Sequence, residues 1–330
     1  MKWLLKNENE NSNKKYIKEN HSKNKKLKNN LRVVNFNNKK LSLIHFVLIF
    51  LVLKRVLFAQ SSEISLIIQG TGQQNIINGG FSSCPDEIYL NSNSVSFLQS
   101  NCKKINILEG TDTSIIKLVF NSKITNLNRM FAELQNIIEV DFSKFDFSEV
   151  TDMSSIFYKS TSITSINLAN INTSLVTTME SMFQECYYLS FLDLSNLNTK
   201  KVKKFTGMFS FCYNLTSLDL SSFNSENLEN ADFMFKLCKS LTSLDLSNFY
   251  TPKFTSMNYM FESCISLTFL DISNFNISNV SSMNHSFFDL EKLESLDLSN
   301  FSTNKVKYMG FLFFKCYKLK YLNLFNFKTN

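Results

Sequence analysis

The stretch Leu215-Thr-Ser-Leu-Asp-Leu-Ser-Ser-Phe-Asn-Ser225 decides the fold, because its pattern returns with a constant period along the chain. The position of Asp219 holds a carboxylate or an amide in eight units: Asp141, Asn167, Asp193, Asp219, Asp245, Asp271, Asp297 and Asn323. A second ladder runs in the same phase and includes Met182-Phe183, Met208-Phe209 and Met234-Phe235. Neither ladder contains an insertion. Similarity at one fixed period predicts a repeat architecture.

Two different apolar spacings alternate inside one unit. Leu192 and Leu194 lie on either side of Asp193, an alternation that predicts a short strand. The next apolar residues recur at intervals of three and four, which predicts a short helix or a run of helical turns: Val202, Phe205, Met208, Phe209, Cys212 and Leu215. One unit is too small to bury a core, so neighbouring units must cover each other. We therefore predict a right-handed α/β solenoid, with parallel strands on a concave face and short helical turns on a convex face.

These residues carry a resemblance to a known family. The unit from Leu215 to Ser225, followed by Leu228, Met234-Phe235 and Cys238, resembles the BspA-type leucine-rich repeat family, a 26-residue repeat of surface proteins. The resemblance covers residues 115–330, and residues 60–114 precede it as a predicted capping region. It implies an exported or cell-surface protein, connected with adhesion in some members, and no enzymatic activity. It identifies no ligand.

Charge is concentrated at the N-terminus. Residues 1–40 carry twelve Lys or Arg and three acidic residues, with few periodic apolar positions, so we predict a disordered basic tail on the cytoplasmic side. Residues 61–330 have a net charge of −4. Their Lys residues are scattered singly, so we expect no nucleic-acid surface.

Residues 41–59 form the one apolar segment suited to a membrane. Residues 41–53 have the length of the apolar region of a cleaved signal peptide, and Ala59 with Ser61 supplies small residues for cleavage. The whole segment 41–59 also suits an uncleaved anchor across the ~30 Å core, with Lys54 and Arg55 reaching the far surface. Both interpretations export residue 61 onward. They leave open a secreted protein or a single-pass membrane protein with a cytoplasmic N-terminus.

The seven cysteines fall into two groups. Cys84 and Cys102 both lie in the capping region and are candidates for a disulfide in an oxidising compartment. The other five occupy one repeat position, where other units hold Leu134, Ser160 and Leu290: Cys186, Cys212, Cys238, Cys264 and Cys316. Exchange with Leu and Ser indicates buried free thiols.

No residue pattern indicates catalysis or a cofactor. His285 is the only histidine after the apolar segment, and none of the seven Gly forms a phosphate-binding motif. We therefore expect no catalytic residues, no metal and no cofactor.

The aspartates of the repeat are the remaining candidate site, with two aromatic neighbours. As outward residues of successive strands, they should form a file of carboxylates ~5 Å apart. One interpretation gives them a structural role, with the Ser two positions later as hydrogen-bond donor. The other makes the concave face a site for a protein or glycan ligand, cationic or polyhydroxylated, with these candidate residues: Asp193, Asp219, Asp245, Asp271, Asp297, Phe191 and Phe269. A structural surface spacer, or an intracellular scaffold if residues 41–59 never insert, is the alternative function.

Overall fold

The computed structural model describes residues 61–95, 102–108 and 112–328. The chain divides into two units, Met1–Ala59 and Gln60–Asn330, and every described residue belongs to the second. The predicted basic tail and the apolar segment 41–59 lie outside the described residues. Within the described ranges, no helix is long and apolar enough to cross a membrane. The prediction of a single-pass membrane protein is corrected to this extent: no span is found among the described residues, and nothing found supports the predicted surface or secreted location.

The first described residues form a cap built around β1 (Ser62–Gln69). On one side β1 pairs antiparallel with β6 (Thr113–Phe120), and on the other with β7 (Ile137–Lys144). Side chains of β1 alternate, and Ile64, Leu66 and Ile68 are fully buried. β3 (Glu87–Leu90) and β4 (Asn93–Val95) extend the sheet in the order β4-β3-β6-β1-β7-β8, while β2 (Gly72–Asn75) pairs with β5 (Lys104–Ile107). We call the described part of residues 61–120 the N-terminal cap.

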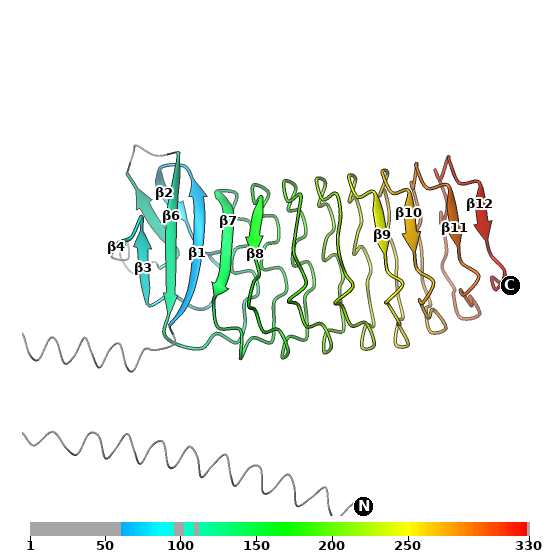
Figure 1. Cartoon of the computed structure of the whole chain (residues 1–330), viewed down its shortest axis with the longest axis horizontal. Helices are drawn as coiled ribbons and strands as arrows, with labels where there is room; N and C mark the ends of the chain where they lie inside the picture. The colour runs from blue at the N-terminus through cyan, green and yellow to red at the C-terminus, as the bar shows by residue number, and fades with distance from the viewer. Residues whose placement is uncertain (1–60, 96–101, 109–111, 329–330) are drawn as a thin grey trace, which may run out of the picture. The chain divides into compact units, whose positions relative to one another are not determined.

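After the cap, each repeat makes one coil of a stack (Figure 1). Short strands of neighbouring coils pair in parallel, each residue with its equivalent in the next repeat. β7 pairs with β8 (Ser165–Asn167), β9 (Ser243–Asp245) with β10 (Phe269–Asp271), and β11 (Ser295–Asp297) with β12 (Tyr321–Asn323). Isolated parallel bridges between equivalent residues, such as Lys204 and Asn230, hold the coils together elsewhere. The repeat period therefore equals one coil.

The predicted helical turns are wrong, because none of the described residues forms a helix. Two residues of each coil, four apart, have a left-handed backbone, as in Gly207 (φ 62°) and Phe211 (φ 62°). A right-handed helix cannot pass through such residues. Instead, the Gly207, Phe209 and Phe211 N–H groups donate to carbonyls of the next coil, at 2.7–2.9 Å.

Tight turns inside the coil surround the two left-handed residues. The N–H of Met208 donates to the Phe205 carbonyl three positions earlier, and that of Cys212 donates to Phe209. Successive turns of this kind place an apolar side chain inward at every third or fourth position, as a helix does. The sequence spacing therefore matched a helix although the backbone hydrogen bonds run between coils.

A ladder of phenylalanines occupies the core on this side of the stack. Adjacent rings stack with centroids 5.7–5.9 Å apart. The phenylalanine ladder consists of Phe131, Phe157, Phe183, Phe209, Phe235, Phe261, Phe287 and Phe313. All except Phe313 are fully buried.

The prediction of an α/β solenoid with a concave face is corrected by the same observations. Curvature was expected because packed helices are spaced more widely than paired strands. Hydrogen bonds between coils join the backbone on both sides of the coil, so no wider helical layer exists among residues 112–328. The described fold is all-β.

Candidate functional site

The repeat aspartates accept a hydrogen bond from their own backbone. One carboxylate oxygen accepts the backbone N–H two positions later, at 2.8–2.9 Å in six coils. In the coil of Asp219, for example, the donor is the N–H of Ser221. An aspartate that bonds its own backbone two positions on forms an Asx turn. The repeat pattern therefore has a local structural cause.

Asparagine fills the same role where the aspartate is missing. The side-chain oxygen of Asn167 accepts the Ala169 N–H at 3.0 Å, and that of Asn323 accepts the Phe325 N–H at 3.2 Å. The turn therefore needs a side-chain oxygen and no charge. The negative charge of the aspartates is free to serve another purpose.

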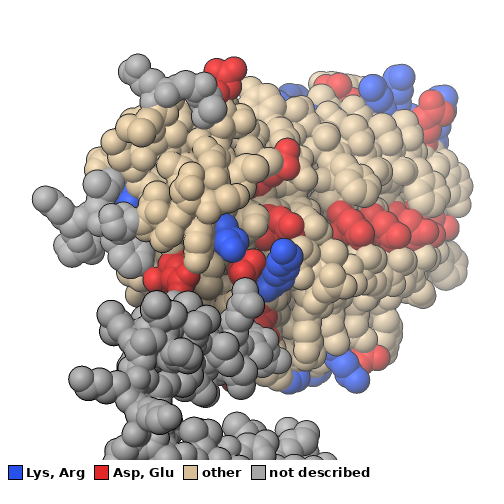
Figure 2. Space-filling view, turned by 60° about the vertical axis from the view of Figure 1, so that its left-hand side comes forward, with Lys and Arg blue, Asp and Glu red and all other residues tan. Residues whose placement is uncertain are grey.

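The carboxylates form a continuous file at the surface of neighbouring coils, in which Asp271 is half-buried and the other members are exposed. Figure 2 shows an unbroken row of acidic side chains running along the repeats. Strand pairing places Asp271 beside Asp245, at the ~4.8 Å spacing of paired strands. We call the exposed strand side of the coils the aspartate face, and its file consists of Asp193, Asp219, Asp245, Asp271 and Asp297.

Hydrogen bonds favour the ionised form of four of these carboxylates despite their proximity. The backbone N–H of Ser195, followed by its hydroxyl, lowers the pKa of Asp193, whereas the Asp219 charge raises it by a smaller amount. The hydroxyl of Ser221, followed by its N–H, lowers the pKa of Asp219. The corresponding serines lower the pKa of Asp245 and Asp297. The file is therefore strongly negative at neutral pH.

Two exposed aromatic rings stand beside the file. The side chains of Phe191 and Phe269 are 68% and 52% exposed. Each occupies the position two before an aspartate of the file. Phe269 and Asp271 thus lie on the same side of β10. Residues 191–193 form no strand, but Phe191 and Asp193 are both exposed and the Leu192 between them is buried. The structure thus brings all seven predicted ligand-binding residues onto one face.

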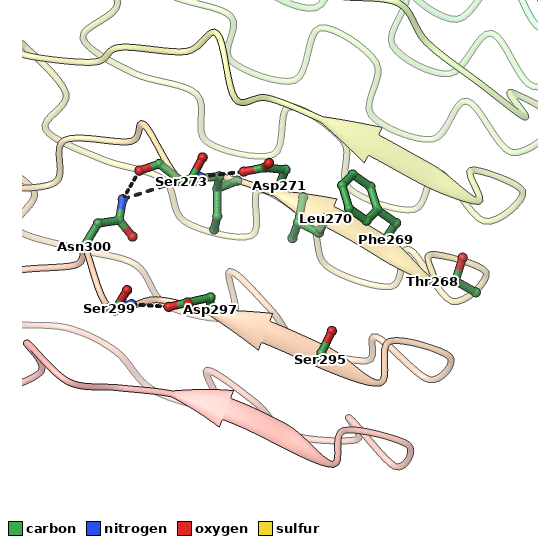
Figure 3. Close-up of a pocket in the computed structure, with 10 residues that line it drawn as sticks. Thr268, Phe269, Leu270, Asp271, Ser273, Ser295, Asp297, Ser299 and Asn300 are labelled. Atoms are coloured by element: carbon green, nitrogen blue, oxygen red, sulfur yellow. Dashed lines mark hydrogen bonds between the residues drawn. The ribbon is translucent and has the colours of Figure 1, made fainter.

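Each ring borders an open groove. One groove, of about 330 Å³, lies between Phe269 with Asp271 and the next coil, which contributes Ser295 and Asp297 (Figure 3). In that view, the Asn300 amide donates to the Ser273 carbonyl at 2.9 Å and ties the two coils together. The other groove, of about 340 Å³, is bordered by the same repeat positions three coils earlier: Phe191, Asp193, Ser217 and Asp219.

The structure joins Cys84 and Cys102 in a disulfide, with Cα atoms 5.7 Å apart. The bond connects the end of the segment before β3 to the segment preceding β5. Its place in the N-terminal cap separates it from the aspartate face, so it bears on the stability of the cap.

The repeat cysteines are free thiols. Burial raises the pKa of Cys212 to about 12, which makes this thiol unreactive at neutral pH. Its Sγ–H donates to the Phe183 carbonyl of the preceding coil at 3.1 Å. In another coil the Ser160 hydroxyl donates to the Phe131 carbonyl at 2.6 Å. Donation across coils explains the exchange of Cys with Ser, a role that the sequence pattern did not reveal.

A second column of stacked rings, one from each of four coils, was not predicted from the sequence. Phe233 stacks on Tyr259 at 5.0 Å, Tyr259 on His285 at 4.7 Å, and His285 contacts Phe311 at 5.1 Å. His285 is thus half-buried between rings. The sequence does contain this pattern, because all four residues have aromatic side chains at the same repeat position. Their backbone is left-handed, which places them at the tips of turns.

The single histidine and the repeat thiols of the described residues lie in packed surroundings. In the part of the chain that the structure describes, no group of three or more His, Cys, Asp or Glu side chains is placed to hold a metal ion. His285 packs among aromatic rings, and burial raises the pKa of the Cys264 thiol in the preceding coil to about 12. The aspartate face therefore remains the candidate site.

Comparison with protein families corrects the expected resemblance. A family model described as "Mycoplasma protein of unknown function, DUF285" matches residues 111–192, 161–268 and 238–330. The matches overlap and together extend over residues 111–330. The resemblance to BspA-type leucine-rich repeats was wrong, and the leucine-rich-repeat label is withdrawn with it. Comparison with curated proteins and with solved structures gave no match. The chain belongs to the DUF285 family.

Proposed function

We propose that this protein is a non-enzymatic binding protein whose aspartate face holds a basic segment of a partner protein. One observation carries the proposal. The turn at each coil needs only a side-chain oxygen, which Asn167 and Asn323 also supply, yet five consecutive coils place a carboxylate there. Like charges in neighbouring coils repel each other, so a file of them is favourable when a cationic ligand neutralises it.

The backbone beneath the file favours binding by a preformed surface. Coils are joined through parallel strands and through side-chain amides such as that of Asn300. A partner would therefore meet carboxylates already in position and lose little free energy in ordering them.

The aspartate-to-asparagine substitution tests the proposal without disturbing the turn. We would replace Asp219, Asp245 and Asp271 with Asn in the full chain and measure binding of fluorescent deca-lysine, with deca-glutamate as the negative control. The original chain should bind deca-lysine in a salt-dependent manner, and the triple variant roughly tenfold or more weakly, equal to about 1.4 kcal/mol. Equal binding by the two proteins would refute a role for the file and favour a structural spacer.

A glycan is the second candidate ligand. The grooves combine an exposed ring with serine hydroxyls and carboxylates, and such a set can stack on a sugar ring and bond its hydroxyl groups. Binding to a glycan array, lost in Phe191→Ser or Phe269→Ser variants and unaffected by salt, would favour this alternative over a basic protein.

A further inference from the structure

We propose that the two grooves of the aspartate face act together and select an extended peptide with Lys or Arg at positions i and i+4. The inference rests on the proposed function, because it specifies the partner of the same face. It is carried by the form of the grooves and by the distance between them.

The grooves exist because one column of the repeat varies in size. Each groove opens beside a Phe, where the next coil places Ser at the same position: Ser217 follows Phe191, and Ser295 follows Phe269. Other coils also hold Ser in this column, including Ser165 and Ser243. A large ring next to a small hydroxyl leaves a hollow that is walled by the ring on one side.

Each groove has the chemistry to bind one long cationic side chain. The ring of Phe269 offers an apolar wall for the methylene groups of Lys or Arg. Asp271 and Asp297, from neighbouring coils, border the same groove and supply two carboxylates for the charged end. A cation near an aromatic face is additionally attracted by the ring. The groove of Phe191 repeats this set with Asp193 and Asp219.

The distance between the grooves determines the spacing of the two basic residues. The coils of Ser217 and Ser243 lie between those of Phe191 and Phe269, so the two rings are three coils apart. At ~4.8 Å between paired strands, three coils span about 14 Å. An extended peptide advances ~3.4 Å per residue and directs alternate side chains to one face, so residues i and i+4 are about 14 Å apart on the same side. A spacing of three would direct the second side chain away from the protein.

Two isomeric peptides test the spacing against the full chain. Thr-Lys-Thr-Ser-Thr-Lys-Thr has its lysines four apart, and Thr-Lys-Thr-Ser-Lys-Thr-Thr has the same composition with lysines three apart. Both are acetylated, amidated and labelled, and binding is followed by fluorescence anisotropy. The first should bind at least about fivefold more tightly than the second.

Serine variants of the two rings are matched controls, since other coils already hold Ser in that column. Phe269→Ser or Phe191→Ser should each remove the preference between the isomers. Equal affinity of the two peptides for the original chain, with deca-lysine still bound, would overturn the two-groove inference and leave the proposed function standing. Failure of deca-lysine to bind would overturn both.

Discussion

In the N-terminal cap, β1 and β6 pair antiparallel along their whole length, whereas the paired strands from β8 onward are far shorter and parallel. The cap buries an alternating strand face and carries a disulfide. The coils bury side chains mainly by stacking each residue on its equivalent in the next coil, as the phenylalanine ladder does. The difference teaches that the cap draws its stability from contacts within one sheet, and a coil draws its stability from its two neighbours.

The largest effect should come from breaking the ladder in mid-stack. Phe209 is fully buried and stacks on Phe183 and Phe235, so Phe209→Ala should destabilise the protein by about 3–5 kcal/mol through the cavity it leaves. Hydrogen exchange should accelerate in the coils on both sides, since each depends on its neighbour. Phe191→Ser, which alters an exposed ring, is the control and should change stability by less than ~0.5 kcal/mol. Loss of protection confined to one coil would contradict dependence between neighbours.

An intermediate effect is expected from opening the disulfide. Replacing both Cys84 and Cys102 with Ala should cost about 2–3 kcal/mol, the usual amount for a loop of this length. The loss should appear as faster hydrogen exchange in β1 and β6, while the central coils keep their protection. Cys212→Ser serves as the control, because a hydroxyl already replaces the thiol at Ser160. Equal loss of protection in cap and central coils would show that the two regions unfold as one.

The smallest effect should come from a single turn of the aspartate face. Asp245→Ala removes the acceptor of the Ser247 N–H and should cost about 0.5–1 kcal/mol, whereas Asp245→Asn keeps the acceptor and should be nearly neutral. Both values come from chemical denaturation at pH 7.

The pH dependence of the free energy of unfolding provides a second test of the role of Asp245. Because Ser247 lowers the pKa of Asp245 in the folded chain, the ionised carboxylate stabilises the fold above the pKa of the unfolded chain, near 3.9. That contribution disappears as the pH falls through the folded pKa. Stability of the original chain should therefore decrease more steeply between about pH 4.5 and 2.5 than that of Asp245→Asn. Parallel pH profiles would contradict the role assigned to the turn.

Predictions from the sequence succeeded where the repeat itself carried the information. The repeat period and the burial of four of the five repeat thiols are found in the structure, and Cys316 is half-buried. Leu192 and Leu194 are buried around an exposed Asp193 as predicted, although these three residues form no strand. The prediction of a helix over Val202 to Leu215 was wrong, because an apolar side chain at every third or fourth position is common to helices and to successive tight turns. The left-handed residues that distinguish the two have no fixed identity: the position holds Arg129, Ser155 and Gly207 in different coils.

The candidate site was likewise predictable only in part: its residues could be named from the sequence, and its grooves could not. Its seven residues were named from repeat positions alone, and the structure places them on one face. The grooves could not be foreseen, because they depend on a Phe in one coil lying beside a Ser in the next, as Phe269 lies beside Ser295.

By itself, the sequence determined the period, the inward residues and the column of aspartates, because a repeat imposes the same environment on equivalent positions. Only the tertiary structure decided that the turns carry no helix and that the aspartate face is grooved. The backbone N–H of Phe209 donates to the Met234 carbonyl in the next coil. The spacing of apolar residues within one coil does not indicate such a hydrogen bond between coils.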